Sequence, residues 1–308
     1  MKRLVALAAL VAALYAVPAL ATPYLLHVMV LSCLYAIPAV GLNLMLGYTG
    51  LVSLGHIAFA GIGAYVAAWL MVDARLGFWS ALAIAVAASG LAGALIGAIC
   101  LRFRSHFFMI VTLAFGLMLY SVMNNWDDVT RGAAGFPGIP RAPGFTTLES
   151  FYRLALSGAL LAFAIQWRVV RSDFGRILLA LRQDERLALA KGVNAALCKT
   201  AVFALGSALA GLGGVLLVSF LRVAAPASFT LAESINAVLV VIVGGAGSLA
   251  GPALGALLFV ALPEYLRVAA EWRLVAFGVL LVLITLFAPR GLAGLIAEGW
   301  RRVARRSQ

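Results

Sequence analysis

The sequence predicts an all-α protein, a polytopic bundle of about ten transmembrane segments. Of its 308 residues, 64% are hydrophobic and only 11% are charged, whereas soluble domains carry about 25% charged residues. The apolar runs are long and continuous, without the alternation that is typical of a membrane β-barrel. Because backbone groups at membrane depth must bond internally, we expect these runs to be helices of one transmembrane domain, 1–308.

Ten apolar segments account for the expected helices. In order, they are 4–21, 25–46, 51–71, 78–101, 105–125, 151–170, 199–221, 229–244, 249–266 and 273–289. The third, eighth and ninth are interrupted or marginal, which predicts broken helices or half-helices. The first segment has an alternative interpretation, because Lys2-Arg3, an apolar core and Ala19-Leu20-Ala21 also fit a cleavable signal peptide.

The distribution of basic residues predicts the orientation. Alternation from a cytoplasmic N-terminus puts more than twice as many of the 23 Lys and Arg residues inside as outside. Both termini, the polar loop 172–194 and the basic tail 290–308 are then cytoplasmic, and the loop 126–150 is external. The net charge of +12 is therefore a topology signal. It indicates a protein of the lipid bilayer, with no nucleic-acid partner.

No pattern for catalysis, metal binding or nucleotide binding is present. The three cysteines are far apart and have no metal or redox spacing. No phosphate-binding Gly-x-x-x-x-Gly-Lys-Ser/Thr loop occurs, so any ATP must be handled by another subunit. Ser53 and His56 lack the third group that would orient a nucleophile and its base. We expect a protein that is not an enzyme and that has no cofactor, catalytic residue or metal site.

Polar residues at membrane depth are few, and they are candidates for lining a translocation path. They are Asn43, Ser53, His56, Glu233 and Asn236. A carboxylate in hydrocarbon costs roughly 2.5 to 3.5 kcal/mol, so Glu233 should face a cavity, a partner or the interface. Interhelical hydrogen bonds are the alternative for the two asparagines. For His56, the alternative is capping or bridging the backbone at a helix break.

Two glycine-rich stretches resemble one another. Residues 41–55 and 234–251 each contain an Asn, an apolar run, a Gly cluster and Ser-Leu. This pattern favours a duplicated unit, as in many transporters, although chance similarity between apolar segments stays open. Small residues at 206–214 and at 90–97 predict close helix packing. The Gly- and Pro-rich loop 126–150 predicts turns, either as a solvated connector or as an external contact surface.

A polar island, Arg171 to Gly192, separates two of the apolar segments. Ser172 or Asp173 can cap the start of a helix, and Gly192 after Lys191 predicts its end. Its apolar residues can pack on the membrane domain or in a partner's groove, and its charges can set the register. A helix lying on the lipid headgroups, held there by its arginines, is the alternative.

At these residues the chain resembles the membrane permease subunits of branched-chain (hydrophobic) amino acid ABC importers. The resemblance covers nearly the whole length and is carried by Gly41–Tyr65, Arg171–Asn194, Val243–Pro252 and Phe287–Leu292. The external loop Gly135–Pro140 is typical of the M-type permease of the pair.

The resemblance implies an inner-membrane importer with a second permease subunit, two cytoplasmic ATPases and an external solute-binding protein as partners. The residues that would belong to the ATPase-coupling loop are Arg182, Asp184, Glu185, Ala188 and Gly192. Leu187 departs from the alanine that is usual in this loop, which leaves the precise contact open. Branched-chain or other hydrophobic amino acids are the expected substrates, with urea or aromatic acids as alternatives. An ion-coupled secondary transporter is the runner-up.

Overall fold

Helices make up nearly all of the described chain. The computed structural model describes residues 9, 11–19, 21–101, 105–265, 278–279, 282, 286, 291–296 and 298. The main helices are α2 (Pro23–Thr49), α3 (His56–Val72), α4 (Phe78–Cys100), α5 (Ser105–Asn125), α7 (Leu148–Arg171), α10 (Ala195–Leu221), α11 (Leu231–Gly245) and α12 (Gly251–Tyr265). The shorter elements are η1 (Val17–Ala19), α6 (Asp127–Thr130), η2 (Gly132–Ala134), β1 (Phe136–Pro137), α8 (Asp173–Gln183), α9 (Glu185–Ala190), β2 (Val223–Ala224) and η3 (Pro226–Phe229).

The helices fall into two length classes. Among the described residues, five helices are long and apolar enough to cross a membrane, namely α2, α4, α5, α7 and α10. The shorter apolar helices are α3, α11 and α12, which are the segments predicted to be broken or marginal. With 15 residues, α11 is about 22 Å long, less than the roughly 30 Å of a hydrocarbon core.

The two ends of the chain are only partly covered. Residues 11–16 of the first predicted segment are helical and lead into η1. The tenth segment, 273–289, and the basic tail, 290–308, lie mostly outside the described residues. The all-α transmembrane architecture is confirmed for the part between them.

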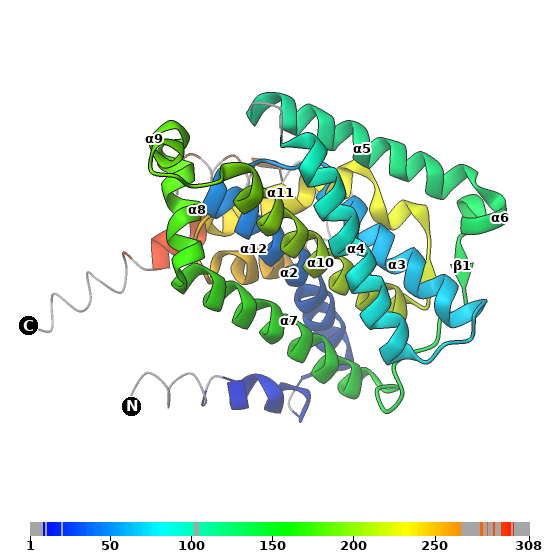
Figure 1. Cartoon of the computed structure of the whole chain (residues 1–308). Helices are drawn as coiled ribbons and strands as arrows, with labels where there is room; N and C mark the ends of the chain where they lie inside the picture. Colours follow the sequence, from blue (N-terminus) through cyan, green and yellow to red (C-terminus); the bar gives the residue numbers. More distant parts are fainter. Residues whose placement is uncertain are drawn as a thin grey trace, which may run out of the picture.

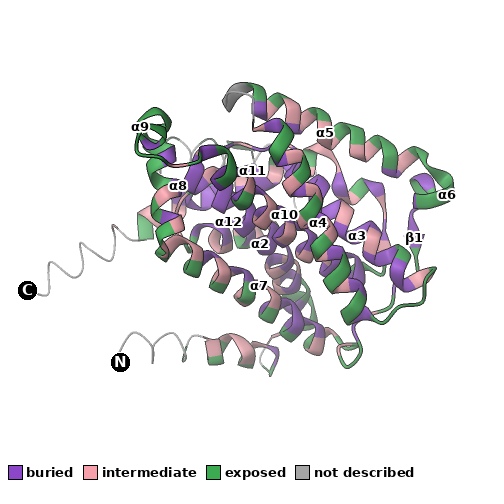
Figure 2. Cartoon of the chain, in the orientation of Figure 1, coloured by how far each residue is buried: buried purple, intermediate pink, exposed green. Residues whose placement is uncertain are grey.

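Helices α2 and α10 form the centre of the bundle (Figure 2). In their most apolar stretches, 67% and 72% of the residues are buried, against 22% in α4 and 17% in α5. Small residues permit the central contact: a Cβ on Gly41 would lie 2.5 Å from the carbonyl oxygen of Gly206. One on Gly93 of α4 would lie 2.4 Å from Ser207. The two predicted small-residue packing faces are therefore confirmed.

The polar island and the Gly/Pro-rich loop lie at opposite ends of the bundle. Figure 1 shows α8 and α9 at the left end and α6 and β1 at the right end. This placement agrees with a topology in which 172–194 and 126–150 are on different sides of the membrane. Which side is cytoplasmic stays a prediction.

The loop 126–150 is folded against the helices. Its turns are as predicted, but it also contains one turn of helix, α6, and a strand, β1, that pairs antiparallel with β2. Arg131 Nη2 lies 2.5 Å from Asp73 Oδ1 at the end of α3, and its guanidinium lies 4.6 Å from the centre of the Phe136 ring. Backbone pairing at β1 and this charged contact hold the loop on the bundle.

Candidate functional site

A cavity of about 220 Å³ lies between α2, α3, α11 and α12. Its lining residues are Tyr35, Pro38, Ile57, Glu233, Asn236, Ala237, Val240, Phe259 and Val260. Glu233 and Asn236 are three residues apart on α11, so the helix places both on one face. Two of the five residues predicted for a translocation path therefore meet at one cavity.

The start of α11 fixes the position of the acid. Thr230 is extended and caps the helix, with its Oγ1 accepting a hydrogen bond from the Glu233 backbone N–H at 3.4 Å. Glu233 is thereby held in the first helical turn, half-buried, at the edge of the apolar interior. Asn236, one turn further along α11, lines the same cavity. The two polar side chains therefore share one face of the helix.

His56 and Ser53 lie behind the cavity and do not line it. His56 begins α3, is fully buried, and donates from Nε2 to the carbonyl oxygen of Pro38 at 3.1 Å. Pro38 lies inside α2 and has no N–H for the helix ladder, so His56 contacts α2 at its irregular position. His56 therefore bridges to the backbone of another helix, as in the alternative to lining a translocation path that the sequence predicts. Within the described residues, Ser53 Oγ is buried without a hydrogen-bond partner.

Asn43 connects α2 to the break between α11 and α12. Its Nδ2 donates to the carbonyl oxygen of Ser248 at 2.9 Å, and its Oδ1 accepts from the N–H of Gly247 at 2.8 Å. Gln166 of α7 donates to the same Ser248 oxygen at 3.4 Å. These interhelical hydrogen bonds account for the burial of Asn43, which lies outside the cavity lining. Its role in a translocation path stays a prediction.

The two similar glycine-rich stretches meet at this point. A Cβ on Gly47 would lie 2.3 Å from the backbone nitrogen of Gly247, and Gly247 has a φ of +80° that favours glycine. In both stretches a helix ends, an irregular break follows and a short helix begins, α2 to α3 and α11 to α12. Arg182 Nη1 of α8 donates to the carbonyl oxygen of Gly47. The contact joins the polar island to both breaks, while a duplication stays a prediction.

The polar island forms two helices, not the single helix that the sequence predicts. Ser172 caps α8, with Oγ accepting from the Gly175 N–H at 3.3 Å, as expected. The chain then breaks at Asp184, which is extended and caps α9 by accepting from the Leu187 N–H at 3.0 Å. An Asp side chain competes with the helical backbone in this way, which explains the break. Gly192, with a φ of +83°, follows the end of α9, as predicted.

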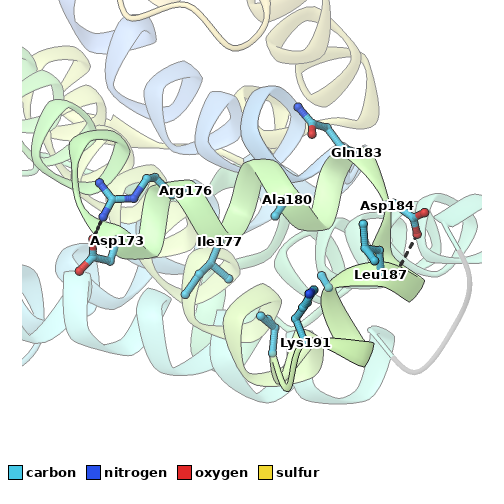
Figure 3. A pocket seen from close by; sticks show the side chains of 10 residues that line it. Asp173, Arg176, Ile177, Ala180, Gln183, Asp184, Leu187 and Lys191 are labelled. Carbon is cyan, nitrogen blue, oxygen red and sulfur yellow. Dashed lines mark hydrogen bonds and ion pairs between the residues drawn. The ribbon is translucent and has the colours of Figure 1, made fainter.

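A groove of about 430 Å³ lies between α8 and α9 (Figure 3). Its apolar residues are Ile177, Ala180, Leu187, Ala188 and Val193. Its polar residues are Asp173, Arg176, Gln183, Asp184 and Lys191. Figure 3 shows the Asp173–Arg176 ion pair at one end of α8 and the Asp184 cap at the other. Charged side chains thus flank an apolar surface outside the long apolar helices.

The predicted coupling residues divide between this groove and the chain's own interior. Asp184 and Ala188 line the groove. Arg182 instead contacts α2, and Glu185 Oε1 lies 2.6 Å from Nζ of Lys199 on α10. Gly192 shapes the turn after α9.

Leu187 departs from the family's pattern and is one of the island's apolar residues, which are expected from the sequence to pack on the membrane domain or in a partner's groove. It is 59% exposed and lines the groove. Ile177, another of these apolar residues, lines it as well. The available signal was a set of apolar residues within a polar, non-spanning segment, where membrane burial does not explain them.

Comparison with known proteins identifies relatives along most of the chain. A family model described as "Branched-chain amino acid transport system / permease component" matches residues 24–288. The LivM high-affinity branched-chain amino acid permease protein of Escherichia coli K12 is 33% identical over 289 residues, covering 85% of this chain and 68% of that protein. The LivH permease protein of the same strain is 26% identical, covering 84% and 91%. No solved structure matches.

Proposed function

This chain belongs to the family of permease components of branched-chain amino acid transport systems, and on that basis we propose its function. It is the M-type membrane-spanning subunit of an ABC importer in the bacterial inner membrane. It moves branched-chain or other hydrophobic amino acids. The observation that carries this proposal is the family match over 24–288, which includes both the α11 cavity and the α8–α9 groove.

The α8–α9 groove is the proposed docking surface for a cytoplasmic ATPase subunit. Its apolar residues lie at one end of the bundle, away from α6 and β1 (Figure 1). An apolar groove flanked by charges suits a segment of a partner protein, since apolar contacts supply area and the charged rim sets orientation. A second permease subunit and a solute-binding protein complete the proposed assembly. The folded loop 126–150 is the candidate contact for the binding protein.

Motion of the docked α8 can reach the cavity through backbone contacts. Arg182 hydrogen-bonds to Gly47, which packs on Gly247, and Gly247 lies in the break that follows α11. Glu233 sits at the other end of this 15-residue helix. A short helix held at both ends by specific contacts can move as a unit, which alternating access requires if ATP and the loaded binding protein favour different states.

The docking proposal is tested by a matched pair of substitutions on α9. Leu187 lines the groove and Leu189 does not, yet they are similarly exposed, at 59% and 51%. We expect Leu187→Asp to reduce ATPase co-purification at least tenfold, because a carboxylate in an apolar contact must be desolvated. Leu189→Asp should retain the ATPase. Equal retention by both variants would contradict the docking surface.

The transport function is tested in proteoliposomes that contain the permease pair, the ATPases and the binding protein. We expect ATP-dependent uptake of radiolabelled L-leucine by the wild-type complex. Uptake of urea or benzoate, with no uptake of any hydrophobic amino acid, would show that the permease transports a different class of solute. Accumulation without ATP, driven by an ion gradient, would instead support a secondary transporter.

A further inference from the structure

The α11 cavity combines one carboxylate with apolar walls. We infer that it is a binding site of the permease itself for a primary ammonium group that carries an aliphatic side chain, with Glu233 as the ammonium-binding residue. The inference rests on the proposed function and adds a recognition chemistry to it.

Glu233 has a carboxylate without a protein cation in the described structure. The ion pairs found there join Arg131 to Asp73, Arg176 to Asp173 and Lys199 to Glu185. A carboxylate near hydrocarbon is unfavourable unless a positive charge or hydrogen bonds compensate it. Asn236 places an amide, a hydrogen-bonding group without charge, beside Glu233 in the cavity lining. A ligand ammonium would supply the compensating charge.

The remaining walls fit the other parts of an amino acid. Pro38, Ile57, Val240 and Val260 present aliphatic surface to the cavity, where an aliphatic side chain is removed from water. The Asn236 amide can donate to a carboxylate while also contacting the acid. The cavity volume of about 220 Å³ equals roughly seven water molecules at about 30 Å³ each. That space suits a single small amino acid.

Aromatic residues close the cavity toward the end that carries β1. Glu233 and Phe229 of η3 also line a second cavity of only about 20 Å³. This volume is too small for an amino acid. The Phe229 ring lies 6.3 Å from Tyr65, and Tyr65 lies 6.1 Å from Phe136 of β1. Phe229 and Tyr65 therefore lie between the cavity and the loop that carries Phe136.

Binding of radiolabelled L-leucine to the purified permease–ATPase complex, without the solute-binding protein, tests the site. We expect Glu233→Gln to weaken leucine binding at least tenfold, because the amide keeps the shape and removes the charge. Glu149→Gln, at an exposed acid that begins α7, is the matched control and should bind as the wild type does. Unchanged leucine binding in Glu233→Gln would overturn the inference.

Competition on the wild-type complex provides a second measurement that does not depend on a variant folding. Isopentylamine keeps the side chain and the ammonium, whereas 4-methylpentanoate keeps the side chain and the carboxylate. We expect isopentylamine to displace leucine at least ten times more effectively, and the opposite order would refute ammonium recognition. ATP-driven leucine uptake by a complex that binds no leucine would overturn the site and leave the transport function intact. No uptake by the wild type would contradict the proposed function itself.

Discussion

The ion pair between Glu185 and Lys199 predicts a charge-swap experiment that separates two roles for Glu185. The family resemblance predicts that Glu185 belongs to the ATPase contact, but its Oε1 lies 2.6 Å from Nζ of Lys199 in the same chain. If Glu185 holds α9 on α10, Glu185→Lys should strongly reduce uptake by repelling Lys199, and the double variant Glu185→Lys/Lys199→Glu should restore it. If Glu185 binds the ATPase directly, the double variant should remain defective.

The expected size of the effect follows from burial. Removing one partner of a fully buried ion pair costs about 3 to 5 kcal/mol. The Lys199 side chain is only 11% exposed, but Glu185 is 49% exposed, so solvent screens the pair substantially. We therefore expect a cost of about 1 to 2 kcal/mol. This cost lowers the equilibrium constant for packing of α9 on α10 roughly 5- to 30-fold.

The assay measures ATPase co-purification and ATP-driven leucine uptake for the wild type, both single variants and the double variant. Extracted permease is quantified in each case, so that loss of membrane insertion is recognised separately. We expect both readouts to fall in parallel in the single variants, and the double variant to recover most of each. Normal uptake by Glu185→Lys, or no recovery in the double variant, would refute the positioning role.

Three further predictions concern contacts between segments that are distant in the sequence. Asn43→Ala should lower the thermal unfolding temperature of the purified complex, since the Gly247 N–H loses its partner at about 1 to 3 kcal/mol, whereas the Ser248 oxygen keeps the hydrogen bond from Gln166. Gly247→Ala should lower it by more than Gly138→Ala, because both have positive φ but only the Cβ at Gly247 has close neighbours; equal shifts would contradict this. Asp73→Asn should cost less than about 1 kcal/mol, since its ion pair with Arg131 is substantially exposed, and a large loss of stability would show that the loop depends on it.

The sequence predicted the helical bundle well because hydrophobic length and glycine breaks act locally. The broken segments, the Ser172 cap and the Gly192 stop all follow from residues within one or two turns of the feature they determine. Asp184 carried the same kind of local signal, with a capping side chain three residues before the Leu187 N–H. A stricter search for internal caps would have divided the island into two helices.

Side-chain directions in the candidate sites could not be predicted in the same way. Glu185 and Lys199 are 14 residues apart, and their contact depends on how the turn at Gly192 returns the chain from α9 to α10. Asn43 and Gly247 are separated by 204 residues. In the sequence, Asn43 stands out as a polar residue in an apolar run, and Gly247 belongs to a glycine cluster. Only the packing of α2 against the α11–α12 break determines that they meet.

The proposed coupling segment, α8 and α9, illustrates why charge alone is a poor guide to a partner surface. Arg182 and Glu185 are prominent in the sequence, yet both side chains contact the chain's own helices, while the exposed Leu187 lines the groove. If α8 and α9 dock an ATPase as proposed, charged residues that hold them in place should affect transport strongly when substituted, as direct contacts would. Restoration by a charge swap within this chain distinguishes the two cases, because a direct contact would require the compensating change in the ATPase.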